Sequence, residues 1–341
     1  MAESDLLQAA WFLLVGVLLA GYAILDGFDL GVGMQHLVTA RTDEERRILM
    51  NSIGPVWDGN EVWLVTAGGA LFAAFPKVYA TTFSGFYLAI MLVLAALIFR
   101  AVSMEFRSRV EGRRWRTAWD VAFSVGSLVP AVLFGVAIGN VMRGIPLDAN
   151  GDFAGTFGEL LSPFALAVGL LSTSVFLVQG SAWLMLKTEG AVATRARRAA
   201  GAGIAAAFVL WLVVTLWSRV EAPGLWETFG GFLPWAAPAV VAAGLATAGL
   251  AVRANRAGQA FLGTSFAIAG MVATLGLGLW PTLVPARKIG EPLTVAGTAS
   301  SDLTLTVMLV VALVGMPLVL AYTTWVYRAF RGKVRLDEHS Y

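Results

Sequence analysis

The feature that most constrains this chain is a succession of apolar runs of about 20 residues, the length of helix that crosses a lipid bilayer. Only 13% of its residues are charged, about half the share found in soluble domains. We therefore expect an all-α integral membrane protein forming a single membrane domain over residues 1–341. Nine membrane helices are predicted, near residues 7–36, 53–75, 77–104, 117–140, 160–186, 201–219, 231–252, 259–280 and 303–328.

The composition excludes several kinds of chemistry. There is no cysteine, so disulfides, thiolate metal sites and cysteine nucleophiles are ruled out. The only histidines are His36, expected at a membrane interface, and His339, so no pair can hold a haem across a bundle core. A net charge of +2 argues against a nucleic-acid partner. We expect no catalytic residue, no metal and no haem in this chain itself.

The distribution of lysine and arginine predicts the orientation. With the amino terminus outside, the inner segments hold 19 of these residues and the outer segments hold 5. Such an imbalance follows the rule that cytoplasmic loops are the positive ones, and adding or removing one helix would destroy it. We therefore expect an external amino terminus, retained as an anchor because MAESDLL lacks the basic region of a signal peptide, and a cytoplasmic carboxyl terminus.

Acidic residues interrupt the first two apolar runs. Asp26 and Asp29 lie in LDGFD, roughly 30 Å along the first predicted helix, and Asp58 and Glu61 lie in WDGNE near the start of the second. A spacing of three residues places both carboxyls of each pair on one helix face. Because the two helices run in opposite directions, all four carboxyls should lie at a similar depth toward the inner side.

Further ionisable residues are expected on the same side. Arg100 and Glu105 end the third run, and Asp120 begins the fourth. An ionisable group inside a bilayer costs at least about 2.5–3.5 kcal/mol, so such groups face a packed interior or a wet cavity and pair with one another. Two interpretations remain open at this point: a structural ion-pair network balanced by Arg100, or a relay that exchanges protons between crowded carboxyls. The relay is the favoured one.

Small residues could allow these acids to be hidden from lipid. Gly27 and Gly31 form one small face on the first helix, and Gly68, Gly69 and Ala70 form another on the second. Small faces let helix backbones approach closely within a membrane. We expect tight helix packing at both.

Several long motifs occur in order along the chain. They are LLVGVLLAGYAILDGFDLGVGM, ERRILMNSIGPVWDGNEVWLVTAGGALFAAFP, YATTFSGFYLAIMLVLAALIFR, MEFRSR, RWRTAWD, SPFALAVGLLS, VQGSAWL and ASSDLTLTVMLVVALV. Together they resemble subunit II of the cytochrome bd type quinol oxidases. The resemblance is densest in residues 10–140 and 280–328, and between about 190 and 275 it rests mainly on hydropathy.

This resemblance implies an architecture and a function. The nine helices would form two four-helix bundles and one peripheral helix in a bacterial cell membrane. The chain would pair with a similarly folded subunit I, which holds two haems b, one haem d and the quinol site. The complex would oxidise quinol and reduce O2 to water with protons from the cytoplasm. A small single-helix subunit would be a further partner, and a structural quinone or lipid in this chain stays an open question.

The resemblance also implies roles for the acids. Asp26, Asp29, Asp58, Glu105 and Asp120 would form the family's proton path, with Arg100 balancing their charge and Glu61 as an additional member. The chain departs from the family at two positions. Val56 stands where relatives have histidine before WDGN, and Glu105 stands where some have aspartate.

Two alternatives belong to other functional classes. A self-sufficient proton-coupled transporter is suggested by the glycine-rich DGFDLGVG, which could unwind at a substrate site. The acids, however, lie toward one side of the membrane rather than at its middle. A purely structural membrane subunit differs from the favoured interpretation only in denying proton transfer.

Overall fold

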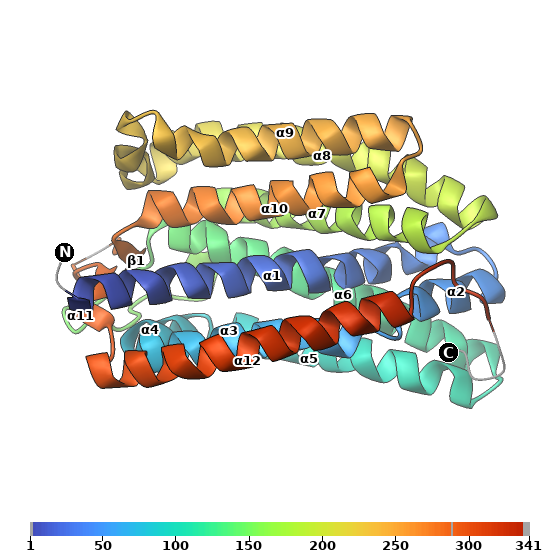
Figure 1. Cartoon of the computed structure of the whole chain (residues 1–341), viewed down its shortest axis with the longest axis horizontal. Helices are drawn as coiled ribbons and strands as arrows, with labels where there is room; N and C mark the ends of the chain where they lie inside the picture. The colour runs from blue at the N-terminus through green and yellow to red at the C-terminus, as the bar shows by residue number, and fades with distance from the viewer. Residues whose placement is uncertain (1–2, 288, 337–341) are drawn as a thin grey trace.

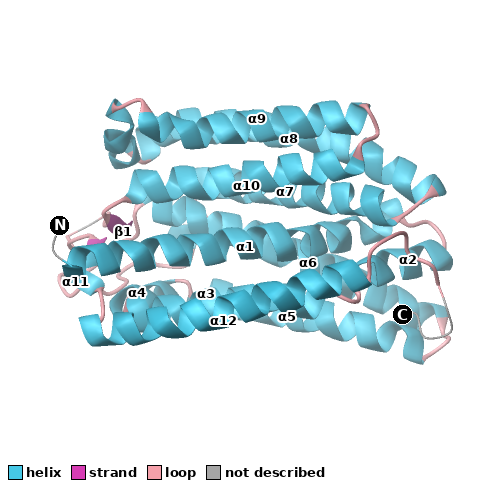
Figure 2. Ribbon diagram, viewed as in Figure 1, coloured by secondary structure: helices cyan, strands magenta, loops and turns pink. Residues whose placement is uncertain are grey.

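The computed structural model describes residues 3–287 and 289–336, which are almost entirely helical (Figures 1 and 2). Among these residues, eight helices are long and apolar enough to cross a membrane, which confirms an all-helical membrane protein. They are α1 (Glu3–Thr39), α5 (Tyr87–Phe106), α6 (Arg113–Arg143), α7 (Pro163–Lys187), α8 (Gly190–Glu221), α9 (Ala236–Arg253), α10 (Ala257–Leu279) and α12 (Asp302–Ala329).

Shorter elements complete the fold. They are α2 (Asp43–Ile53), α3 (Trp57–Ala74), α4 (Pro76–Gly85), α11 (Val295–Thr298), the 3-10 turns η1 (Arg107–Arg109), η2 (Gly158–Leu160), η3 (Pro223–Gly230) and η4 (Leu233–Trp235), and the strands β1 (Thr282–Val284) and β2 (Leu293–Thr294). The antiparallel pair β1–β2 aligns Thr282 with Thr294. We name the two ends of the molecule the α2 end and the α11 end, after the helices that Figure 1 shows there.

Two of the predicted helices differ in form from the expected runs. The run 53–75 corresponds to α3, an 18-residue helix that is not among the eight apolar ones because Asp58, Asn60 and Glu61 lower its hydropathy. The run 77–104 is divided into α4 and α5 at Phe86, whose backbone leaves helical geometry at φ −96° and ψ 19°.

Helix α1 occupies the centre of the molecule and contacts α3, α6, α7 and α10 (Figure 1). Helices α7, α8, α9 and α10 pack in sequence on one side of it, and α3, α5 and α6 lie on the other. Helix α12 contacts α1 and α3 but leaves most of its apolar surface exposed. Asp26 and Asp29 on α1 are therefore surrounded by other helices of the same chain.

Glycine allows the closest of these contacts. A Cβ atom added to Gly31 would lie 2.0 Å from the carbonyl oxygen of Phe176, and one added to Gly180 would lie 2.4 Å from the carbonyl carbon of Gly31. The backbones of α1 and α7 thus touch where the first small face was expected. The second expectation is wrong within this chain, since nothing lies within 4 Å of a Cβ at Gly68 or Gly69.

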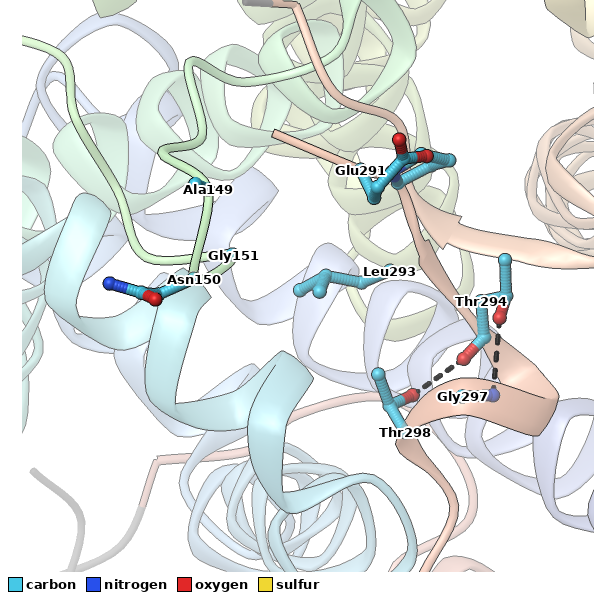
Figure 3. Close-up of a pocket in the computed structure, with 9 residues that line it drawn as sticks. Ala149, Asn150, Gly151, Glu291, Leu293, Thr294, Gly297 and Thr298 are labelled. Carbon is cyan, nitrogen blue, oxygen red and sulfur yellow. Dashed lines mark hydrogen bonds between the residues drawn. The ribbon is translucent and has the colours of Figure 1, made fainter. Parts of the chain in front are cut away.

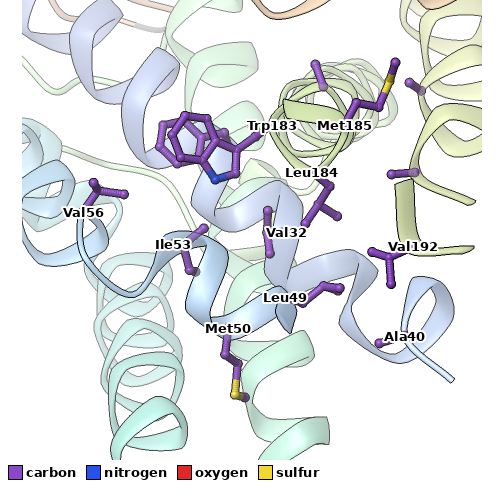
Figure 4. Packing of buried hydrophobic residues seen from close by; sticks show 14 of the residues in the cluster. Val32, Ala40, Leu49, Met50, Ile53, Val56, Trp183, Leu184, Met185 and Val192 are labelled. Carbon is purple, nitrogen blue, oxygen red and sulfur yellow. The ribbon is translucent and has the colours of Figure 1, made fainter. Parts of the chain in front are cut away.

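The α2 end is closed by an apolar core (Figure 4). Helix α2 begins with a capping box between Thr42 and Glu45, which satisfies backbone N–H groups that a helix start leaves free. Its buried face packs Ile53 toward Trp183, whose indole N–H donates to the carbonyl of Ser52 at 3.0 Å. This core fixes α1 and α7 relative to α2 at the α2 end.

Candidate functional site

Three helices, α1, α3 and α5, bring together one largely buried group of charges. The fully buried side chain of Arg100 on α5 donates through Nη2 to Asp26 Oδ1 on α1, at 2.8 Å. The same nitrogen also donates to Glu61 on α3. Asp29 lies one turn after Asp26 and is likewise fully buried. We call Asp26, Asp29, Glu61 and Arg100 the Arg100 cluster.

Polar side chains extend the Arg100 cluster toward α12. The amide nitrogen of Asn60 donates to Asp29 Oδ2 at 2.7 Å, and the hydroxyl of Tyr327 donates to Asn60 Oδ1 at 2.9 Å. The hydroxyl of Tyr22, one turn before Asp26, is buried without a hydrogen-bond partner among the described residues, as are Asp26 Oδ2 and Asp29 Oδ1. The cluster therefore keeps free lone pairs that can receive protons.

The charges of the Arg100 cluster do not balance. Three carboxyls lie near one guanidinium, which pairs with Asp26 and Glu61, so ionisation of all three would leave two negative charges uncompensated. An uncompensated charge in a protein interior costs several kcal/mol even after relaxation. Ionisation of all three carboxyls together is therefore disfavoured.

A second buried group lies at the α2 end around Asp120 on α6. Asp120 Oδ1 accepts from Arg107 Nε at 2.6 Å and lies 2.6 Å from Nε2 of His36. Asp120 Oδ2 accepts from Arg46 Nη1 at 2.7 Å. Arg107 also donates through Nη2 to Asp43 Oδ1 at 2.7 Å. We call these five residues the Asp120 cluster.

The Asp120 cluster joins four elements, namely α1, α2, η1 and α6. Arg116 Nη1 adds a further donor to Asp43, at 3.1 Å. Two carboxylates thus face three guanidinium groups, and charge-assisted hydrogen bonds to each oxygen favour the ionised carboxylate. This arrangement holds Asp120 as a fixed negative charge.

A partly exposed ion pair lies next to the Asp120 cluster. Arg195 on α8 donates to Glu45 and, through Nε, to the carbonyl of Thr39 at 2.6 Å. Burial alone would raise the pKa of Glu45. Hydrogen bonds from Arg195 and from the backbone N–H groups of Arg41 and Thr42 outweigh that effect and lower the pKa below its ordinary value. Glu45 therefore remains ionised and links α8 to the start of α2.

The structure divides the predicted proton path. It brings Asp26, Asp29, Glu61 and Arg100 together and places Asp120 in the separate cluster at the α2 end. Asp58 lies on α3 one turn before Glu61, with its side chain exposed on the surface of this chain. Glu105 is exposed near the end of α5.

One of the two histidines can be compared with the structure. His36 lies in the last turn of α1, and its side chain is fully buried against α6. The surrounding helices exclude solvent there although His36 is near the end of its own helix. His339 lies outside the described residues. Within them, no group of three or more His, Cys, Asp and Glu side chains could hold a metal ion.

Sequence reasoning missed several members of the two clusters. Arg107 follows Arg100 by seven residues, two helical turns, a spacing that could have revealed it. Asn60 stands inside the WDGNE motif between Asp58 and Glu61. Tyr327 has no such signal, since it comes from the far end of the chain and only the packing of α12 on α3 brings it to Asn60.

The pocket in Figure 3 lies at the α11 end, away from both clusters. It has a cavity volume of about 160 Å³ and lies between the 149–151 loop and the segment from Glu291 to Thr298. Thr294 organises its wall by accepting from the backbone N–H of Gly297 at 3.1 Å and from the hydroxyl of Thr298 at 2.7 Å. None of the residues that line this pocket belongs to either cluster.

Comparison with known proteins relates this chain to a family. The family described as cytochrome bd terminal oxidase subunit II matches residues 7–330. The chain is 38% identical over 371 residues to cytochrome bd-I ubiquinol oxidase subunit 2 of Escherichia coli K12, covering 99% of this chain and 98% of that protein. It is 35% identical over 333 residues to cytochrome bd ubiquinol oxidase subunit 2 of Bacillus subtilis 168, with coverages of 97% and 98%.

A solved structure shares the fold. A chain in the structure of bd oxidase from Geobacillus thermodenitrificans matches with a TM-score of 0.77 at 18% identity, covering 95% of this chain and 98% of that one. The likeness supports the helix arrangement described above.

Proposed function

The chain belongs to the cytochrome bd terminal oxidase subunit II family, and from this premise we propose that it binds no haem and conducts protons toward the oxygen-reducing haem of its partner. It is a multi-pass membrane protein and a subunit of an oxidoreductase complex. The observation that carries the proposal is the Arg100 cluster, where Arg100 pairs with the buried Asp26 and the partly exposed Glu61, and the buried Asp29 lies one turn from Asp26.

We infer a topology of nine crossings, with α3 as the ninth. Its 18 residues span about 27 Å, close to the thickness of a hydrocarbon core, although its polar first turns lower its hydropathy. Helices α1, α3, α5 and α6 form one four-helix bundle, α7–α10 form the other, and α12 is peripheral. The α2 end faces the cytoplasm, since most lysines and arginines cluster there.

The proposed proton path begins at the cytoplasmic α2 end. Glu105 and Asp120 lie near its entrance, and Asp29 and Asp26 hold protons in the Arg100 cluster. Asp58 then exchanges protons with the partner surface, because it is exposed on α3 one turn from Glu61. Arg100 keeps the cluster from accumulating excess negative charge, and Glu61 is the additional carboxyl that shares this guanidinium.

The resemblance and the named relatives supply the rest of the proposed complex. A haem-bearing subunit I would contain the two haems b and the haem d, oxidise quinol and reduce O2 to water. Each reduced oxygen atom must take up protons, and this chain would deliver them. The named relatives are ubiquinol oxidase subunits, so ubiquinol is the proposed substrate of the complex. A small single-helix subunit and a bound quinone or lipid stay part of the proposal.

Replacing Asp29 by asparagine tests the proton path. Asparagine has nearly the same shape and can still accept the hydrogen bond from Asn60, but it cannot take up a proton. We expect assembled complex with normal haem content whose O2 consumption with quinol falls at least about tenfold, as for loss of a proton-transfer group. Asp152→Asn at the α11 end is the matched control.

Two results would contradict the proposal. Turnover at the wild-type rate in Asp29→Asn would remove Asp29 from the path, and loss of assembly with normal turnover per haem would leave only a structural role. A reduced-minus-oxidised spectrum of the tagged, detergent-extracted chain tests the partnership. Bands of b- and d-type haems that vanish when the partner is absent are expected, whereas a stable colourless single chain would favour a transporter.

A further inference from the structure

His36 is a buried titratable group to which the proposed path gives no role. Its Nε2 atom lies 2.6 Å from Asp120 Oδ1, and its ring meets Phe123 edge to face with centroids 5.1 Å apart. The second ring nitrogen, Nδ1, is buried and has no hydrogen-bond partner among the described residues. An unmade hydrogen bond inside a protein is costly, so the buried Nδ1 needs an explanation.

The surroundings of His36 determine which nitrogen carries hydrogen. The charged groups that act on it are Asp120 on α6, Arg107 on η1 and Arg46 on α2. Both oxygens of Asp120 accept hydrogen bonds from guanidinium groups, so Asp120 is a carboxylate and can only accept from the imidazole. Nε2 therefore carries hydrogen, and in the neutral ring Nδ1 is a free acceptor.

Buried hydroxyl groups occupy the interval between His36 and the Arg100 cluster. His36 follows Asp29 by seven residues on α1, two turns on the same helix face and about 10 Å along the axis. On α6, Ser124 donates to the carbonyl of Gly33 at 3.0 Å. Ser127 lies so close to Gly33 that an added Cβ would be 1.9 Å from the serine Oγ.

The same segment of α6 packs on the backbone of α5 at Arg100. A Cβ added to Gly126 would lie 3.0 Å from the backbone nitrogen of Arg100. Ser124 and Ser127 thus lie one and two turns beyond Asp120, and Gly126, beside Ser127, adjoins the backbone of Arg100. A hydroxyl group can accept and donate a proton at once, so these serines can serve as steps between the two clusters.

We propose that His36 is the proton-transfer residue that connects the Asp120 cluster to the Arg100 cluster by way of Ser124 and Ser127. Nδ1 takes a proton arriving from the α2 end, and the resulting imidazolium is stabilised by the carboxylate of Asp120. The same proton then leaves Nδ1 toward the serine hydroxyls, while the Nε2 hydrogen stays on Asp120 and the ring returns to its neutral form. This inference rests on the proposed function, since it needs protons to travel through this chain.

The test uses the assembled oxidase with His36→Gln. The glutamine amide can still donate to Asp120 but cannot be protonated, so assembly should persist. We expect O2 consumption with quinol to fall at least about tenfold and its pH profile to lose one ionisation in the range where imidazole titrates. Ser181→Ala is the control, since it removes a buried hydrogen bond to Gln35, the neighbouring residue on α1. It should change neither readout.

Parallel measurements on Asp29→Asn separate the two proposals. A slow Asp29→Asn enzyme beside a His36→Gln enzyme with the wild-type rate and pH profile would overturn the role of His36 and leave the proton path intact. Normal turnover in Asp29→Asn would overturn the path itself. If His36→Gln does not assemble, the double variant Ser124→Ala, Ser127→Ala decides: slow turnover is expected, and a wild-type rate would overturn the inference.

Discussion

The two buried clusters contain the same kinds of residue and differ in their balance of charge. In the Arg100 cluster three carboxyls lie near one guanidinium, whereas in the Asp120 cluster three guanidinium groups, counting Arg116, face two carboxylates. Excess acid in a buried site favours bound protons, and excess cation favours ionised carboxylates. A buried acid in this chain can thus store a proton or fix a helix end, and its neighbours decide which.

The largest effect is expected from removing the single cation of the Arg100 cluster. Arg100→Leu leaves Asp26 and Glu61 without their donor in a buried site. We expect a loss of about 3–5 kcal/mol of stability, as for other broken buried ion pairs, and little assembled complex. Thermal unfolding of the detergent-solubilised complex measures this, with Arg100→Lys as the charge-preserving control. An unchanged unfolding temperature would show that the acids need no counter-charge.

Removing one charge from the Asp120 cluster should lower stability by a smaller amount. Asp120→Asn leaves Arg46 and Arg107 facing a neutral acceptor, and hydrogen bonds to charged groups contribute about 1.5–3 kcal/mol. Arg107 retains Asp43 and Arg46 is partly exposed, so we expect a loss of about 2 kcal/mol. Comparing the unfolding temperature with that of Asp152→Asn isolates the effect of burial. A larger loss than in Arg100→Leu would reverse the ranking of the clusters.

Asp58 should affect rate without affecting stability. It is exposed on this chain, so Asp58→Asn should change the free energy of unfolding by less than about 0.5 kcal/mol, as is usual for surface substitutions. If the exposed carboxyl passes protons to the partner, O2 consumption falls while haem content stays normal. Stopped-flow proton uptake with the purified complex measures this. Proton uptake at the wild-type rate in the variant would show that Asp58 is not part of the proton path.

The smallest effect is expected from the partly exposed ion pair of Glu45 with Arg195. The pKa of Glu45 is lowered in the folded protein, so the pair stabilises the fold above the unfolded pKa of about 4.3. This stabilisation is lost as pH falls through the folded pKa. Glu45→Gln should therefore lower stability by about 0.2–1 kcal/mol at pH 7 and by much less below about pH 3. Unfolding temperatures across pH test this, with Glu44→Gln as control. A pH-independent difference would exclude the ion pair as its cause.

Particular residues show how far sequence reasoning reaches. The placement of Asp26 and Asp29 on one face followed from their spacing, and the partnership of Arg100 with them was expected from its position at the end of the third run. The complete burial of His36 could not be derived, because burial depends on the helices that surround a residue. The separation of Asp120 from the other acids also could not be derived, since depth along the chain does not reveal which side chains meet.

The sequence by itself determined the membrane character, the order of the helices, their predicted orientation and the acid-rich composition of the first turns of α3 and the middle of α1. These properties depend on hydropathy, spacing and loop charge, which are local. Only the tertiary structure decided that the acids divide into an acid-rich cluster and a cation-rich one, and that His36 on α1 is buried against α6. The balance of charge around a buried group depends on helices that are far apart in the sequence, and packing alone brings them together.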